Sequence, residues 1–478
     1  MPRKKKEIVV TPKLFRDDDL TDKLAEIVDQ KWTKNKFVLL TPSAGVGKTF
    51  VTIHAVGKLP GGKNAHFMIF GPKAKKMDYS WDASIMGYNT VKNMDMSYSV
   101  QTHDYIRTHP DEILAEAAQY HNAGQAVVLV LDEVHLVKNP TSKVGKALKK
   151  LVDSPVIDVS IGLSATPYSN SYIDTIGYLV LNNYYKNKTD FIKNQILYFD
   201  DYHQPMIKNA DGIIDRNLFK DPDKIDQALS EFSADIKLKK SPLPPASFQE
   251  ITFDLNNDPS IKFVDPAFID FEDTRPRTQR GNYNAIKNKY YREGFYESAI
   301  ESVAVQRNMI TNIIQRTQIL IDIIKNIRES SDPHPILIFY QNNIELETIT
   351  KALTSTKKIS KTTINIVNGK QKDLDDVTDP NTVVLIQYKA GGAAIEFPHA
   401  YSSIYFMPTY SYENYKQTLG RNRRNGMTHP VKYYKIIANN TLDDYIWHNI
   451  LDNKKTFSNK LMNIVMASQS SSSNEDDF

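Results

Sequence analysis

The sequence has 478 residues, and at roughly 100–200 residues per domain this length predicts two or three domains. It contains no cysteine, which excludes disulfides and thiolate metal sites. The 60 basic and 56 acidic residues leave a net charge of +4, so any nucleic-acid surface must be local. No apolar run approaches the roughly 18 residues of a membrane span, and the basic N-terminus lacks the apolar core of a secretory signal. We therefore expect a soluble cytoplasmic protein that is neither secreted nor bound to a membrane.

Short apolar runs alternate with amphipathic stretches in the first third of the chain, and each run ends in polar, Gly or Pro residues. These runs are 36–42, 66–72, 126–133 and 156–167. Such alternation of strand and helix patterns predicts a parallel sheet that is covered by helices on both faces.

A glycine-containing loop, TPSAGVGKTF, follows the first predicted strand. Glycine permits a tight loop whose N–H groups cradle phosphates, Lys48 would reach the β- and γ-phosphates, and the Thr49 hydroxyl would hold Mg²⁺. The predicted phosphate-binding residues are Ser43, Ala44, Gly45, Val46, Gly47, Lys48 and Thr49. Pro42 stands where the usual pattern begins with glycine. The alternative is a strand–helix turn that binds no ligand.

Two adjacent carboxylates, Asp132 and Glu133, end the third predicted strand. In a parallel sheet the ligand lies beyond the carboxyl ends of the strands. We expect Asp132 to hold Mg²⁺ and Glu133 to orient the attacking water, as phosphoryl transfer requires. A helix N-cap is the alternative role for an acid pair at this position.

The next predicted strand ends in GLSATP, in which Ser164, Ala165 and Thr166 occupy a turn. Alone these small residues would be turn formers. Because they follow the phosphate loop and the acid pair in chain order, we assign them a coupling role.

Helical patterns dominate residues 168 to about 330. The strand-like runs then resume at 335–341, 363–369, 382–392, 402–408 and 431–438. The whole layout predicts two α/β lobes with a mostly helical segment between them.

Near the end of the chain, QTLGRNRRNG contains Gln417, Arg421 and Arg424. The two arginines are three residues apart and would share a face on a helix. Two guanidiniums would suit a γ-phosphate held between two lobes, in the manner of an arginine finger. A solvated basic helix and a DNA-backbone contact are the alternatives.

In this order the pieces resemble the superfamily 2 helicases and translocases, most closely the Swi/Snf-type motors with two RecA-like lobes. DEVHLVKNPTSKVGKAL (132–148) resembles the DEAH box and the segment after it, IFGPKAKKMDYSW (69–81) motif Ia, and QTHDYI (101–106) motif Ib. GLSATPYSNSYIDTIGYL (162–179) resembles motif III, PILIFYQNNIELETITKAL (335–353) motif IV, AGGAAIEF (390–397) motif V and QTLGRNRRNGMTHPV (417–431) motif VI. The resemblance covers roughly residues 35–465.

Several positions depart from the pattern of this family. Ala394 replaces a usual Gly and Glu396 a usual Asn in motif V, while Met427 stands where Gln is usual. Gln30 is a weak match for the adenine-reading glutamine. Because motif V contacts DNA and couples the lobes in this family, these departures bear on stepping.

The resemblance implies a DNA-dependent ATPase that uses ATP and Mg²⁺ and moves along or unwinds DNA, here a monomer in phage or viral replication or recombination. It places Gly392 near the nucleotide and Lys73, His103 and Lys389 near DNA. An RNA-directed motor of viral transcription and a nucleotide-gated DNA clamp that does not step are the alternatives.

The resemblance also implies domain bounds. We expect an N-terminal arm at 1–34, a first lobe that binds ATP at 35–185, a helical inter-lobe segment at 186–330, a second lobe at 331–466 and a disordered acidic tail at 467–478.

Two further segments invite a binding role. In 275–296, cations interleave with aromatic rings, a pattern that suits single strands or a fork; the cations are Arg275, Arg277, Arg280, Lys287, Lys289 and Arg292, and the rings are Tyr283, Tyr290 and Tyr291. A mobile loop before a solvated helix is the alternative. The tail ends in NEDDF, which would dock a replication protein, shield the basic groove or simply keep the chain soluble.

Overall fold

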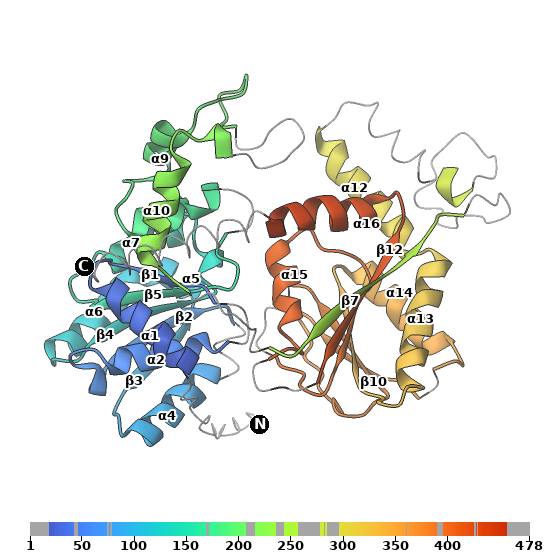
Figure 1. Cartoon of the computed structure of the whole chain (residues 1–478), viewed down its shortest axis with the longest axis horizontal. Coiled ribbons are helices and arrows are strands. Elements are labelled where there is room, and N and C mark those ends of the chain that lie inside the picture. The colour runs from blue at the N-terminus through green and yellow to red at the C-terminus, as the bar shows by residue number, and fades with distance from the viewer. Residues whose placement is uncertain are drawn as a thin grey trace, which may run out of the picture. The chain divides into compact units, whose positions relative to one another are not determined.

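The computed structural model divides into two compact units. It describes residues 19–42, 46–73, 76, 79–168, 172–206, 216–235, 243–256, 278–281, 283, 296–359, 361–389, 395–424, 427 and 429–456. Unit 1 is formed by the chain up to Pro242 together with 393–395 and the residues from Lys454 on. Unit 2 is formed by 243–392 and 396–453. Figure 1 shows a sheet flanked by helices in each unit.

Unit 1 is built on a six-stranded sheet in which every pair of neighbours is parallel. Its strands, in spatial order, are β3 (Ser97–Thr102), β2 (His66–Gly71), β4 (Val127–Asp132), β5 (Val159–Leu163), β1 (Val38–Leu40) and β6 (Ser233–Ala234). Alternate residues of the central strands face opposite sides, so Val128 and Val130 join one buried cluster and Leu129 and Leu131 the other. This two-sided burial explains the continuous apolar runs in the sequence.

Helices cover both faces of this sheet. The first face carries α1 (Asp19–Trp32), α2 (Lys48–Gly57) and α4 (Ser80–Lys92). The second carries α5 (His103–Thr108), α6 (Pro110–Asn122), α7 (Lys143–Val152), α8 (Ile176–Leu181) and α10 (Pro222–Phe232), with α9 (Lys188–Gln195) against α8. Short 3₁₀ turns lie at Gly62–Asn64, Val134–Leu136, Tyr172–Thr175 and Arg216–Leu218.

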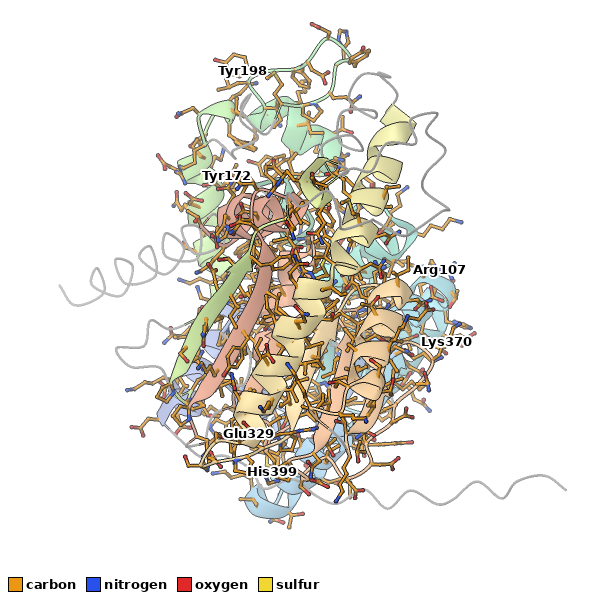
Figure 2. The ribbon with its side chains drawn as sticks, turned by 90° about the vertical axis from the view of Figure 1, so that its right-hand side faces the viewer. Arg107, Tyr172, Tyr198, Glu329, Lys370 and His399 are labelled. Atoms are coloured by element: carbon orange, nitrogen blue, oxygen red, sulfur yellow. The ribbon has the colours of Figure 1, made fainter. Side chains whose placement is uncertain are left out.

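A small hairpin follows α9 in unit 1. The Asp200 carboxylate accepts hydrogen bonds from the backbone N–H groups of Tyr202 and Gln204 and so closes the turn. Tyr198 and Tyr202 are exposed by 54% and 85%. Figure 2 shows Tyr198 near the outer end of the unit, whereas Tyr172 lies further in. The hairpin is therefore held by polar contacts at its turn and not by a core of its own.

Unit 2 contains a second six-stranded sheet with parallel neighbours throughout. Its strands, in spatial order, are β7 (Ala246–Phe253), β12 (Val431–Ala438), β11 (Ser402–Tyr405), β8 (Ile336–Tyr340), β10 (Thr382–Gln387) and β9 (Thr363–Val367). Its helices are α12 (Tyr296–Thr311), α13 (Ile314–Arg328), α14 (Asn343–Ser355), α15 (Tyr412–Leu419) and α16 (Leu442–Tyr445), with a π turn at Ile446–Leu451. The prediction of two parallel α/β lobes of RecA-like type is confirmed.

Several details differ from the sequence-based expectations. The helix α1 belongs to the core of unit 1, since Leu24, Val28 and Trp32 are buried, although it falls in the predicted arm. The division into units falls at Pro242, within the predicted inter-lobe segment. That segment contributes β6 to one sheet and β7 to the other. None of the described helices is long and apolar enough to cross a lipid bilayer.

Candidate functional site

The order of strands in unit 1 brings the predicted nucleotide residues to one edge of the sheet. The strands β4, β5 and β1 are neighbours, and all three run in the same direction. The register pairs Leu40 with Leu163 and Leu163 with Asp132. Segments that follow these three residues therefore emerge side by side, which is where parallel sheets bind ligands.

The described part of the loop before α2 includes a glycine with positive φ. Gly47 has φ +107°, a conformation that glycine adopts readily and that side chains disfavour. Lys48 begins α2, and its Nζ donates to the Pro42 carbonyl at 2.8 Å. Thr49 is half-buried in the first turn of the same helix. Ser43, Ala44 and Gly45 lie outside the described residues.

The two carboxylates at the end of β4 have different surroundings. Asp132 is 7% exposed, and its Oδ2 accepts a hydrogen bond of 3.1 Å from Nε1 of the fully buried Trp81. Glu133 has left-handed φ and ψ of 53° and 49°, which non-glycine residues rarely adopt. This turn separates the directions of the two side chains. The pair therefore offers one fixed and one less buried carboxylate.

His135 joins the acid pair to the predicted coupling segment, although no role was predicted for it. Its Nδ1 lies 2.9 Å from the Ser164 hydroxyl and 3.4 Å from Oε2 of Glu133. The same hydroxyl accepts the N–H of Thr166 at 3.1 Å. Ser164, with Ala165 beside it, is thus linked through one imidazole to the carboxylate that follows Asp132.

His103, for which a contact with DNA was predicted, lies close to the acid pair. It begins α5 beside Asp132, and its Nε2 is buried with no hydrogen-bond partner in the described part of the chain. Burial lowers the pKa of His103 to about 4, and the nearby Asp132 opposes this only in part. The ring is therefore neutral near pH 7 and offers no positive charge to a phosphate. Lys73, in contrast, is exposed just after β2.

In unit 2 the two arginines of the predicted finger follow α15 and are not on a helix, because Gly420 ends it. Gln417 lies half-buried in the last turn of α15. Arg421 is 6% exposed, and its carbonyl accepts the N–H of Phe397 at 2.9 Å. The prediction that Arg421 and Arg424 share a face of a helix is therefore wrong.

Arg424 is paired with an acid from the preceding motif. Its Nε lies 3.6 Å from Oε1 of Glu396, and the two side chains are 24% and 51% exposed. Glu396 is the residue that departs from the family pattern at this position. The departure thus places a carboxylate against a predicted catalytic arginine.

The predicted nucleic-acid residues of unit 2 have different surroundings. Lys389 is exposed just after β10. Arg280 donates from both terminal nitrogens to the carbonyls of Asn440 and Asn439, at 2.9 and 3.0 Å. Tyr283 is 3% exposed and its hydroxyl accepts the N–H of Leu442, so this ring is not open for stacking on bases. Both side chains hold the turn after β12. Gly392, Arg275 and Arg277 fall outside the described residues.

Comparison with known proteins gives one family match. Residues 315–426 match the helicase conserved C-terminal domain, and this stretch runs from α13 through the two arginines after α15. No curated protein matches the chain. Together with the two parallel α/β units, the matching domain supports a helicase-like, nucleotide-hydrolysing protein of superfamily 2.

Proposed function

We propose that the protein is an ATP-dependent DNA helicase or translocase of Swi/Snf type. The observation that carries this proposal is the edge of the unit 1 sheet, where Lys48, Asp132 and Glu133 follow strands in a β4–β5–β1 series. The helicase C-terminal domain in unit 2 supplies the second half of such a motor.

The residues of unit 1 fit ATP and Mg²⁺ by their chemistry. The Lys48 ammonium suits the β- and γ-phosphates, and the Thr49 hydroxyl and Asp132 carboxylate are oxygen ligands of the kind that Mg²⁺ prefers. The hydrogen bond from Trp81 to Oδ2 orients the Asp132 carboxylate at this edge of the sheet. Bound Mg²⁺ would neutralise charge on the phosphates, while Glu133 would orient the attacking water.

The choice of DNA and of pathway rests on the sequence motifs alone. Seven motifs resemble those of Swi/Snf-type motors in the same order, and that group acts on duplex DNA. We propose a monomeric motor that acts in phage or viral DNA replication or recombination, in the cytoplasm of a bacterial or infected cell. Arg421 and Arg424 would stabilise the charge on the transferring phosphoryl group.

A turnover assay with a panel of nucleic acids tests this proposal. ATP hydrolysis is measured without nucleic acid and with duplex, single-stranded or forked DNA, or with RNA. We expect DNA to stimulate turnover more than RNA does, and displacement of a triplex strand to separate stepping from clamping. Stimulation by RNA alone would contradict the assignment.

Two variants link that turnover to the proposed residues. Lys48→Ala should abolish hydrolysis, and Glu133→Gln should bind ATP yet hydrolyse it at least about 100-fold more slowly, the usual minimum for loss of a general-base step. Lys58→Ala, at the other end of α2, and Glu26→Gln, on the exposed side of α1, are matched controls. Near-normal turnover in Lys48→Ala or Glu133→Gln would overturn the proposed roles.

A further inference from the structure

A pocket of about 260 Å³ lies in unit 1, between the segment that follows the acid pair and the helices α7, α8 and α9. Five apolar residues line it: Val137, Pro140, Leu148, Val180 and Leu181. Its volume is below the roughly 300–1,000 Å³ of clefts that bind drug-sized ligands. The size and lining therefore suit one large apolar side chain rather than a whole cofactor.

The same pocket is strongly one-sided in charge. Its lining includes five lysines, Lys138, Lys146, Lys149, Lys186 and Lys188, and no Asp or Glu. Lys138 pairs with Asp174 at 3.3 Å, and Lys149 pairs with Asp153. Within the described ranges, Lys146, Lys186 and Lys188 form no ion pair. An apolar hole with three such ammonium groups at its rim suits a ligand that carries an aromatic group next to several carboxylates.

The chain itself contains such a segment. Residues 474–478 read NEDDF, with three carboxylates directly before an aromatic ring. We propose that this segment binds in the pocket of its own chain, with Phe478 between the apolar walls and Glu475, Asp476 and Asp477 toward the lysines. The site is thus a receptor for an acidic peptide with an aromatic residue. It is independent of the proposed motor activity.

The length of the tether is compatible with this contact. The last described residue is Thr456, and residues 457–473 separate it from the segment. A chain of that length spans at most roughly 60 Å when extended. A compact unit of about 240 residues has a radius of gyration of only about 18 Å. Closing such a loop costs little extra as it lengthens, and the lysines at the rim attract the acidic segment over about a Debye length.

The absence of cysteine makes a direct crosslinking test possible. In the full chain, Ser473→Cys is combined with Thr141→Cys at the rim of the pocket, or with Lys63→Cys as the control. Lys63 is exposed at the opposite edge of the same sheet, since it precedes β2 whereas Thr141 follows β4. A short bis-maleimide should join 473 to 141 at least tenfold faster than 473 to 63. The assay needs neither ATP nor nucleic acid, so its failure and that of the motor are distinguishable.

Further variants decide whether docking causes the crosslink. Phe478→Ala, or Lys146→Glu with Lys188→Glu, should reduce the rate to that of the control, and Phe478→Trp should keep it. Thermal melting checks that the rim variants remain folded. Equal rates at 141 and 63, or no effect of Phe478→Ala, would overturn the proposal. Covalent dimers from a mixture of singly substituted chains, without the intramolecular product, would assign the site to a second copy and overturn docking within one chain.

Discussion

The neighbouring arginines Arg423 and Arg424 look equivalent in the sequence but have different partners in the structure. Arg424 faces a half-exposed carboxylate. Its neighbour Arg423 donates from Nε to the Pro244 carbonyl at 2.7 Å and therefore holds the start of β7. Of these two neighbours, we expect Arg424 and not Arg423 to contribute to catalysis.

That distinction predicts different kinetics for the two substitutions. Arg424→Ala should lower turnover by about 10³–10⁵-fold, as loss of an arginine finger does, and change ATP affinity little. Arg423→Ala should lower stability and leave turnover of the folded protein near normal. Glu396→Gln removes a pair worth at most about 1 kcal/mol and should raise turnover no more than about fivefold. Steady-state kinetics with titrated ATP separate these outcomes, and a loss of DNA binding alone in Arg424→Ala would reassign it to the nucleic-acid groove.

His103 predicts a dependence of stability on pH. Its pKa falls from 6.5 to about 4 on folding, so the unfolded chain binds more protons between these values. The folded state should therefore lose stability as the pH drops from 6.5 toward 4, with no contribution from this group above that window. Urea unfolding at pH 7 and pH 5 should show a smaller difference in His103→Gln than in the unchanged chain. His54 and His334, whose pKa values are also lowered, would contribute the remaining slope, and an unaltered difference in His103→Gln would contradict this account.

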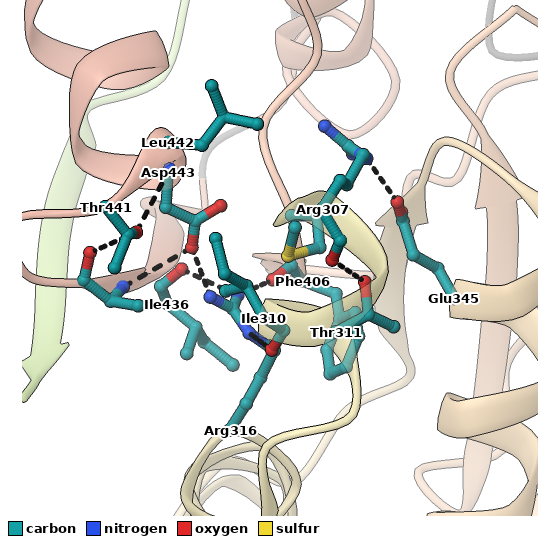
Figure 3. A network of polar contacts seen from close by, with 12 residues as sticks. Arg307, Ile310, Thr311, Arg316, Glu345, Phe406, Ile436, Thr441, Leu442 and Asp443 are labelled. Carbon is teal, nitrogen blue, oxygen red and sulfur yellow. Dashed lines mark hydrogen bonds and ion pairs between the residues drawn. The ribbon is translucent and has the colours of Figure 1, made fainter. Parts of the chain in front are cut away.

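At the scale of single elements, α13 is anchored by a buried arginine (Figure 3). Arg316 is fully buried and pairs with the fully buried Asp443 of α16. It also donates to the carbonyls of Phe406, Ile436 and Ile310. One guanidinium thus joins α13 to the ends of β11 and β12. In the chain, β11 comes before the segment with Arg421 and Arg424, and β12 comes after it.

Removal of this anchor should be costly. Arg316→Met leaves Asp443 buried without its cation, a change that typically destabilises by about 3–5 kcal/mol. The exposed pair between Lys358 and Asp322, also on α13, provides the control, because such pairs contribute about 0–1 kcal/mol. Urea unfolding of Arg316→Met and Lys358→Met should therefore differ by several kcal/mol. Similar midpoints for both variants would show that Arg316 does not anchor the helix.

Most of the strands that could be predicted from the sequence are buried on both faces. The apolar runs of β1, β2, β4, β5 and of β8 and β10 are almost continuous, and all of these strands are fully or nearly fully buried. The missed strands β3, β6 and β7 lie at the edges of their sheets. In β3 and β7 all residues are half-buried or exposed, so their sequences SYSVQT and ASFQEITF carry no apolar run. Such an edge strand is specified mainly by the neighbour it pairs with, whereas the edge strand β9 was predicted because its run TINIV keeps three apolar residues.

In the candidate site, too, features set by neighbouring residues in the sequence could be predicted, and contacts between distant residues could not. The strand-end rule was sufficient to place Lys48 and Asp132 at one edge. The contacts of Trp81 with Asp132 and of Arg424 with Glu396 join residues that are distant in sequence. The burial of His103 and Tyr283 likewise depends on elements elsewhere in the chain. Neither position could be judged from the residues next to it in the sequence.

At the scale of the whole molecule, the division into two units predicts which fragments of the chain can fold on their own. The matched helicase domain begins at residue 315, yet β7 pairs with β12 along eight residues, from Ala246 with Val431 to Phe253 with Ala438. A fragment 243–456 should therefore fold, whereas 315–456 loses an edge strand and α12 and should unfold or aggregate. Circular dichroism and urea titration of the two fragments provide the measurement. Cooperative unfolding of 315–456 with the same midpoint would show that β7 is dispensable.

The buried arginine of α13 also has a consequence for synthesis of the chain. Its partners Phe406, Ile436 and Asp443 lie 90, 120 and 127 residues further along. While the ribosome is still making these residues, the guanidinium of Arg316 has none of these three partners. Its burial would then carry an uncompensated desolvation cost. Closure of this unit must wait until residue 443 has emerged, whereas the sheet of the first unit ends with β6 at Ala234 and can form far earlier. Messages truncated before that codon should yield products that chaperones retain and proteases remove.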